Sequence, residues 1–180
     1  MRLPARLAAC VLSLGLLAAA CAGPARAPVR TPAPIPSPPS PLRGLSAAEV
    51  EALRAGEGAG AARAAELNGY PGPKHVLELA DSLALSPDQR AGVEASRARM
   101  LATARRLGAE ILAGEAGLEA AFREGVMGAE ELGRRVRAIA ELRGRLRLAH
   151  LEAHLETAAL LTPEQRQRYQ HLRGHGEGHR

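Results

Sequence analysis

A five-residue phrase near the middle of the chain, Leu85-Ser86-Pro87-Asp88-Gln89, returns 76 residues later as Leu161-Thr162-Pro163-Glu164-Gln165. Both copies have the features of a helix start. The Ser or Thr is an N-cap, whose side-chain oxygen accepts a hydrogen bond from a backbone N–H of the first turn. Proline is tolerated next, because its missing N–H has no partner there. The glutamine three residues after the cap reaches back to the N–H of the cap and completes a capping box.

Around these two starts, apolar residues recur every three or four positions, which is the period of an amphipathic helix. The pattern predicts long helices over Pro87–Arg123 and Ala129–Leu160, connected by a turn at Glu124–Gly128. Shorter helices are expected at His75–Leu83 and Pro163–Leu172, and no segment has the alternation of a strand. The expected fold class is therefore all-α, a long antiparallel helical hairpin with short flanking helices. Such a hairpin has a thin core, so we expect a homodimer to cover its remaining apolar surface.

The first 20 residues have the composition of an export signal. Arg2 and Arg6 supply positive charge, and the apolar run Leu7–Ala20 that follows is short for a membrane span. Leu17-Ala18-Ala19-Ala20-Cys21 resembles a bacterial lipoprotein cleavage site, which predicts lipidation of Cys21. The alternative is an ordinary secretory signal cut at nearly the same place. Either interpretation places the protein outside the cytoplasm, and lipidation predicts a periplasmic protein anchored to the outer membrane.

Residues 21–67 are rich in Pro, Ala and Gly, which predicts an extended tether. A short helix within it is consistent with Ser46 and Glu49, which have the spacing of a further capping box. The turn-forming cluster at 68–73 then opens the expected helical domain, residues 68–173. Residues 174–180 form a tail that is rich in His and Gly.

Composition argues against several classes of function. The chain has 24 basic and 19 acidic residues, a formal net charge of +5, and loss of Arg2 and Arg6 with the signal reduces the charge to +3. No basic face carries interleaved aromatic residues, so we expect no nucleic-acid partner. Cys10 lies in the signal and Cys21 is predicted to be acylated, which leaves no cysteine for a disulfide, a metal or catalysis. The sequence has no phosphate loop and no nucleophile elbow, and we do not expect an enzyme.

The two repeated phrases resemble the LTxxQ motifs of the Spy/CpxP family of periplasmic stress proteins. The export signal and the long hairpin between the motifs agree with this resemblance, which covers residues 68–173. Residues 68–80, NGYPGPKHVLELA, also resemble a subgroup of periplasmic heavy-metal sensors or resistance proteins, the ZraP-like and CnrX-like proteins. Ser86 stands where the motif has Thr, which is a conservative change for a cap.

The resemblance implies a curved, antiparallel homodimer. Spy-like members are ATP-independent chaperones that hold unfolding proteins, and CpxP-like members dampen envelope-stress signalling. Expected partners are therefore unfolded or misfolded periplasmic proteins, with a sensor kinase or an anti-sigma factor as a further candidate. We assign client binding to an arginine-rich face of the second long helix, for which the alternative is an ordinary solvated face. Its arginines are Arg134, Arg135, Arg137, Arg143, Arg145 and Arg147.

Metal binding is the alternative function. His150 and His154 are four residues apart on one predicted helix, so both imidazoles project from one face, and this spacing suits Zn²⁺ or another divalent transition metal. His75 and Glu78 would complete the site if the short helix that carries them packs across the hairpin. CnrX-like sensors also use helix-borne His and carboxylate ligands. The other interpretation is a pair of surface histidines.

The C-terminal tail is a second metal candidate. His171, His175 and His179 recur every four residues, and Gly174, Gly176 and Gly178 stand between them. Glycine prevents a stable helix here, so the tail offers adaptable imidazole ligands, which suit Zn²⁺, Ni²⁺ or Cu²⁺. ZraP-like members carry His-rich segments as well. The alternative is a polar terminus without a task.

Overall fold

A computed structural model describes residues 42–174, which form helices, turns and loops and contain no strand. The all-α class is therefore confirmed for this part of the chain. Its helices are α1 (Ala47–Ala55), α2 (Arg63–Leu67), α3 (Pro73–Glu78), α4 (Pro87–Arg123), α5 (Ala129–Leu160) and α6 (Pro163–Leu172). No helix of this part is both long and apolar enough to cross a membrane. The predicted signal, Cys21, the tether up to residue 41, and His175 and His179 lie outside the described residues.

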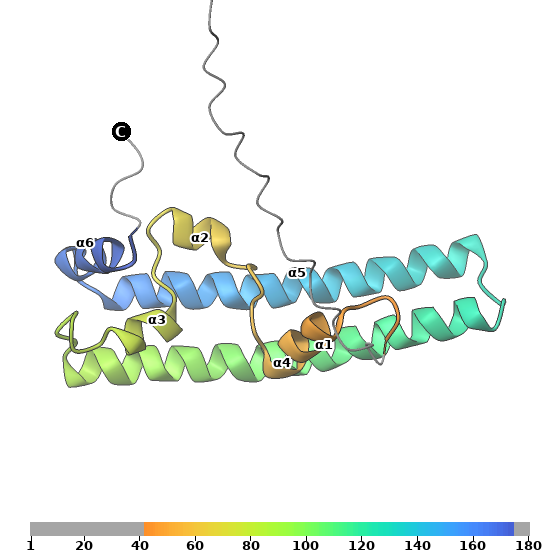
Figure 1. The fold of residues 1–180 in the computed structure, drawn as a ribbon, viewed down its shortest axis with the longest axis horizontal. Helices are drawn as coiled ribbons and strands as arrows, with labels where there is room; N and C mark the ends of the chain where they lie inside the picture. The colour runs from red at the N-terminus through yellow and green to blue at the C-terminus, as the bar shows by residue number, and fades with distance from the viewer. Residues whose placement is uncertain (1–41, 175–180) are drawn as a thin grey trace, which may run out of the picture. The chain divides into compact units, whose positions relative to one another are not determined.

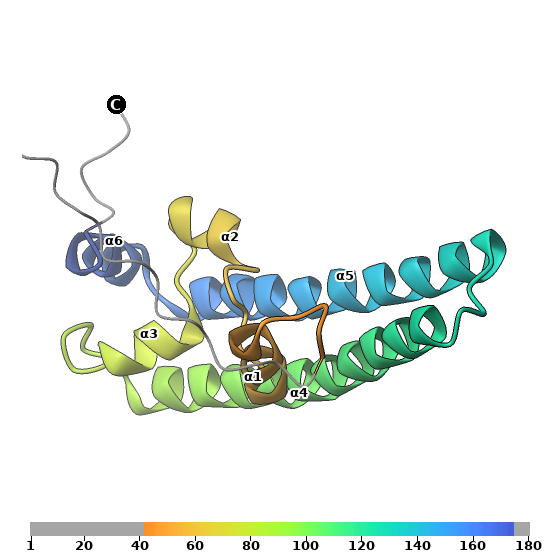
Figure 2. The same ribbon diagram turned by 45° about the vertical axis from the view of Figure 1, so that its right-hand side comes forward.

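The long helices α4 and α5 lie side by side (Figure 1 and Figure 2). Both begin and end at the residues that the sequence predicts. The Ser96 hydroxyl donates to Glu156 near the end of α5 at 2.6 Å, and Arg143 in the middle of α5 donates to Glu115 at 2.8 Å. Positions progressively later in α4 therefore contact positions progressively earlier in α5.

One core cluster joins α1 to both long helices. Its buried members are Leu45, Val50, Leu53, Ala104, Leu107, Ile111 and Leu146. Gly108 of α4 is buried here because the backbone of α1 approaches it closely. A Cβ on Gly108 would lie 2.1 Å from the carbonyl oxygen of Leu53. The chain is therefore packed in a core from residue 45 onwards.

This packing corrects the predicted boundary at residue 68 between tether and domain. The short helix expected near Ser46 is confirmed as α1, with Ser46 and Glu49 forming its capping box. The glycines that follow belong to the folded domain rather than to a spacer. Gly56 ends α1 with a left-handed φ of +72°, where glycine avoids the steric penalty of a side chain, and this cap helps the chain turn back along the domain.

A second core cluster joins α3 and α6 to the start of α4. Its buried members are Val76, Leu83, Val93, Leu161 and Tyr169. The helix predicted over His75–Leu83 spans Pro73–Glu78 instead, and turns occupy residues 79–84. The chain has to reverse before it enters α4, and Ala84 accordingly takes a φ of +50°. Leu83 still reaches the core, at 2% exposure, so the apolar pattern correctly predicts burial but not the helix end.

Both repeated phrases are helix caps, as predicted. Ser86 accepts from the N–H of Gln89 at 3.1 Å, and Thr162 accepts from the N–H of Gln165 at 3.2 Å. In both boxes the glutamine side chain accepts from the N–H of the cap in return. The hydrogen bonds that cap α4 and α6 are therefore formed within each motif.

Candidate functional site

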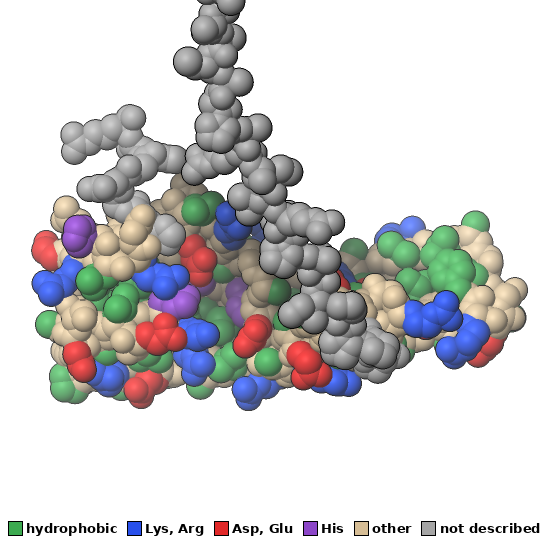
Figure 3. All heavy atoms as spheres, viewed as in Figure 1, with side chains coloured by type: hydrophobic (Ala, Val, Ile, Leu, Met, Phe, Trp, Pro, Cys, Tyr) green, Lys and Arg blue, Asp and Glu red, His purple; other side chains and the backbone are tan. Residues whose placement is uncertain are grey.

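Three of the predicted histidines line one pocket. His150 and His154 come from α5 and His75 comes from α3, and the loop that leads into α2 closes the other side. The cavity has a volume of about 180 Å³. Histidine side chains are visible on the face that carries α2 and α3 (Figure 3). The tertiary structure thus brings His75 together with the pair on α5, which is the packing that a joint site requires.

The pair on α5 is buried rather than on the surface. His150 and His154 are each 5% exposed, which corrects the interpretation as surface histidines. Two glycines of the N-terminal segment lie against their rings. A Cβ on Gly58 would be 3.2 Å from His150 Cε1, and a Cβ on Gly72 would be 2.9 Å from His154 Cε1. The segment can therefore lie directly over the imidazoles because it has no side chain at these two positions.

Two of the three imidazoles are each anchored through their own Nδ1 atom. His154 Nδ1 lies 2.9 Å from the carbonyl oxygen of Tyr70, which only accepts hydrogen bonds, so Nδ1 carries the hydrogen. His75 Nδ1 lies 2.8 Å from a carboxylate oxygen of Glu78 on the same short helix. These contacts fix the orientation of both rings.

His150 is the third imidazole, and its Nε2 is fully buried without a hydrogen-bond partner within the described part of the chain. Burial, and secondly the neighbouring His154, lower the pKa of His150 below its ordinary value of 6.5. The ring is therefore neutral at pH 7. A buried polar atom without a partner costs stability, of the order of 1–3 kcal/mol.

The predicted metal set does not fit the pocket as a unit. Glu78 is half exposed, does not line the cavity, and is engaged by His75. The hydrogen bond from His75 is the main reason why the pKa of Glu78 lies below its ordinary value. Across residues 42–174, no three His, Cys, Asp or Glu side chains are grouped as metal ligands would be. Arg63 and Lys74 line the cavity as well, and permanent positive charges repel a divalent cation.

His171, the first histidine of the tail motif, lies elsewhere. It is exposed near the end of α6 and lines a different groove together with Leu83 and Arg168. The structure therefore places it apart from the histidine pocket. His175 and His179 fall outside the residues that the structure describes.

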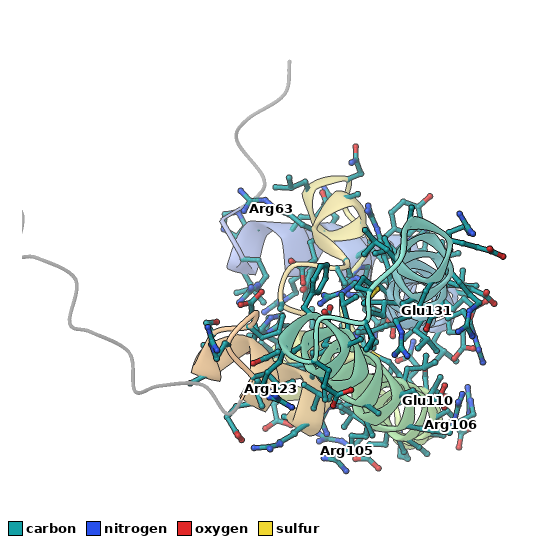
Figure 4. All side chains as sticks on the ribbon, turned by 90° about the vertical axis from the view of Figure 1, so that its right-hand side faces the viewer. Arg63, Arg105, Arg106, Glu110, Arg123 and Glu131 are labelled. Atoms are coloured by element: carbon teal, nitrogen blue, oxygen red, sulfur yellow. The ribbon has the colours of Figure 1, made fainter. Side chains whose placement is uncertain are left out.

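The arginine-bearing face of α5 is the second candidate site. Arg134 and Arg135 both pair with Glu131, and Arg143 pairs with Glu115 of α4. Glu131 is labelled in Figure 4, which views the domain from the connection between α4 and α5.

The remaining arginines of this set are Arg137, Arg145 and Arg147, which are exposed and form no ion pair with any described residue. Large apolar side chains are exposed on the same helix: Val136 (47%), Leu148 (53%) and Leu155 (56%). The outer surface of α5 thus combines free positive charge with uncovered apolar area. We call these six residues the α5 face; at 3.6 residues per turn they spread over about half of the helix circumference.

Sequence reasoning did not find Arg63, Glu66 and Lys74, which line the histidine pocket. Arg63 and Glu66 lie within the predicted tether, which had no expected place in the packed fold, and Lys74 lies in the predicted domain but was not assigned a role. The run of glycines before α2 was the available signal, because it allows close approach to another element. Comparisons of the chain with protein-family models, with curated proteins and with solved structures found no match.

Proposed function

We propose that this protein is an ATP-independent chaperone of the Spy/CpxP type, acting in envelope stress, which holds unfolded clients on the α5 face. The observation that carries the proposal is the coexistence on one helix of three exposed apolar side chains and three unpaired arginines. The two LTxxQ-like motifs support the assignment to this class of protein.

The chemistry of the α5 face suits an unfolded client. Exposed Val and Leu side chains gain about 25 cal/mol for each Å² of apolar area that a client covers. Arginine adds long-range attraction for acidic segments, and its aliphatic stem can lie along apolar surface while the charge stays in water. A face of this kind binds many sequences weakly, which a holding chaperone requires.

The proposal includes a curved antiparallel homodimer of the α4–α5 hairpin. Phe122 near the end of α4 is 56% exposed and Val126 in the connection is 69% exposed, so apolar surface remains uncovered at this end as well. A second copy would bury part of this surface. Sedimentation equilibrium of the mature chain tests this: a monomer at micromolar concentrations would contradict the dimer.

The proposed location is the periplasm, with Cys21 acylated and held in the outer membrane, and a sensor kinase or anti-sigma factor as a further partner. Labelling cells with a radioactive fatty acid tests the anchor. Label should enter the wild-type protein and should be absent from Cys21→Ala. Equal label in both would contradict lipidation at this residue.

The chaperone proposal is tested by light scattering from a chemically denatured client that is diluted into buffer without ATP. The mature protein at several-fold molar excess should suppress aggregation. The variants Leu148→Ser/Leu155→Ser and Arg137→Glu/Arg147→Glu should each lose most of this protection, because they remove the apolar and the charged part of the face.

Matched controls are available on other helices. Leu67→Ser in α2 removes a leucine that is 59% exposed, and Arg168→Glu in α6 reverses an exposed charge. Both should protect the client like the wild type. Loss of protection in the controls, or full protection by the α5 variants, would contradict client binding on this face.

A further inference from the structure

The histidine pocket has an unusual charge balance. Arg63 at the start of α2 and Lys74 in α3 both line it, and among residues 42–174 Glu66 is the only acidic residue that does. Neither cation forms an ion pair with an acidic side chain of residues 42–174. Lys74 is also the only lysine in the chain. Two permanent positive charges thus face one cavity with a single carboxylate to offset them.

One of the histidines that line the pocket has a polar atom without a partner in the described part of the chain. His150 is 5% exposed and its Nε2 has no partner among the described residues, although buried polar atoms in proteins are nearly always hydrogen-bonded. His154 is anchored through Nδ1 to the carbonyl oxygen of Tyr70. A polar pocket that is lined by two cations without ion-pair partners among the described residues favours a ligand with negative charge.

The size of the cavity limits the ligand. Its volume of about 180 Å³ is enough for several water molecules. A tetrahedral oxyanion fits such a space, and of a larger ligand only a group of about this size fits within it. The two cations favour negative charge, and charge-assisted hydrogen bonds from Arg and Lys to an oxyanion are among the stronger polar contacts in proteins.

We propose that the pocket binds a small oxyanion of the size of phosphate, with Arg63 and Lys74 as its charged donors. The bound anion links α2 and α3 to each other above His150 and His154 of α5. We assign an oxyanion rather than the divalent metal that the histidines alone suggest, because the positive charges of the pocket repel a metal cation. It is independent of the chaperone proposal, which concerns the α5 face.

The test is isothermal titration calorimetry of the mature protein with inorganic phosphate, at constant ionic strength maintained with chloride. Phosphate should bind at one site per chain, and sulfate should compete with it. Arg63→Ala and Lys74→Ala should each weaken binding about tenfold or more, the size expected for loss of one charge-assisted contact. Phosphate should also raise the melting temperature of the wild type but not of the two variants.

Arg106→Ala is the matched control, because Arg106 lies on α4 on the opposite side of the domain from Arg63 in Figure 4. It should bind phosphate like the wild type. Circular dichroism of each variant tests whether it is folded. We expect both pocket variants to fold, because Arg63 and Lys74 are exposed.

Two results would overturn the proposal. One is phosphate affinity that is unchanged in both Arg63→Ala and Lys74→Ala. The other is Zn²⁺ binding that His154→Ala abolishes and Arg63→Ala does not reduce, because that result would identify a metal site. Vesicles of phosphatidylglycerol form a separate arm: binding that requires Arg63 would show that a lipid headgroup supplies the phosphate.

Discussion

The side-chain amides of Gln89 and Gln165 bond to each other in both directions. Gln89 Nε2 donates to Gln165 Oε1 at 2.8 Å, and Gln165 Nε2 donates to Gln89 Oε1 at 3.0 Å. Each amide also donates to a backbone carbonyl just before the other motif. Gln89 donates to the carbonyl of Leu160 at 2.9 Å, and Gln165 donates to that of Leu83 at 3.2 Å. The two motifs are therefore one structural unit, which ties the start of α4 to the joint between α5 and α6.

The first prediction concerns this unit. Gln89→Ala and Gln165→Ala should each lower the free energy of unfolding by about 1–3 kcal/mol, because each removes several part-buried hydrogen bonds and leaves acceptors unpaired. The double variant should lose clearly less than the sum, with a coupling of about 0.5–3 kcal/mol. Urea denaturation measures all three variants.

Gln167→Ala is the control for this cycle, since Gln167 lies on the same helix α6 and is exposed. It should change the free energy of unfolding by less than about 0.5 kcal/mol. Strict additivity of the two motif variants would show that the amide pair does not form in solution.

The second prediction compares two glycines inside the long helices. Alanine is normally better than glycine in a helix by about 0.5–1 kcal/mol, and Gly144→Ala in α5 should gain this amount because the added Cβ would meet no atom within 4 Å. Gly108→Ala should instead destabilise the protein, because the new Cβ would collide with the carbonyl of Leu53 and push α1 away.

Thermal unfolding distinguishes the two glycine variants, and hydrogen exchange of residues 47–55 reports on α1 itself. We expect faster exchange in α1 for Gly108→Ala and unchanged exchange for Gly144→Ala. Equal stabilisation by both substitutions would mean that α1 does not pack on α4 as described.

The third prediction uses the buried imidazole. Because the folded state lowers the pKa of His150, the unfolded chain takes up this proton more readily. The contribution of His150 to stability is therefore present above pH 6.5 and decreases as the pH falls through its folded pKa. His150→Leu removes both this pH dependence and the unpartnered Nε2.

Urea denaturation between pH 8 and pH 5 tests the prediction. The wild type should lose more stability than His150→Leu over this range, and the variant should be at least as stable as the wild type at pH 5. The exposed His171→Leu, as control, should follow the wild type. A parallel loss in wild type and His150→Leu would argue against a neutral buried imidazole.

The fourth prediction concerns the C-terminal histidines, which the sequence pattern assigns to metal binding. Removal of residues 174–180 should abolish weak binding of Ni²⁺ or Zn²⁺, because it removes His175 and His179. His150→Ala/His154→Ala should leave this binding intact. Calorimetric titration with each metal measures the binding. Unchanged binding by the truncated chain would show that the tail does not bind the metal.

How far the sequence predicts the fold depends on the range of the interaction. The ends of α4 and α5 and the start of α6 are predicted correctly because caps, prolines and the apolar period act within a few residues. The predicted end of α3 is wrong, because a chain reversal set by packing against α4 decides it. The predicted tether boundary is wrong for a similar reason: the burial of Leu45, Val50 and Leu53 depends on a distant part of α4.

The same difference between local and long-range interactions applies to the candidate site. The i,i+4 spacing of His150 and His154 correctly predicts a shared helix face, but it does not tell whether that face is buried or exposed. The predicted role of Glu78 also fails, because its nearest partner is His75 on its own helix rather than the histidine pair.

The sequence by itself determined where α4 and α6 start, since in each of them the cap and its glutamine lie three residues apart and hydrogen-bond to each other. Only the tertiary structure decided that Gln89 meets Gln165, 76 residues away, and that Tyr70 holds His154, 84 residues away. Contacts at such separations depend on how whole helices pack, and packing is set by the combined burial of many side chains rather than by any local pattern.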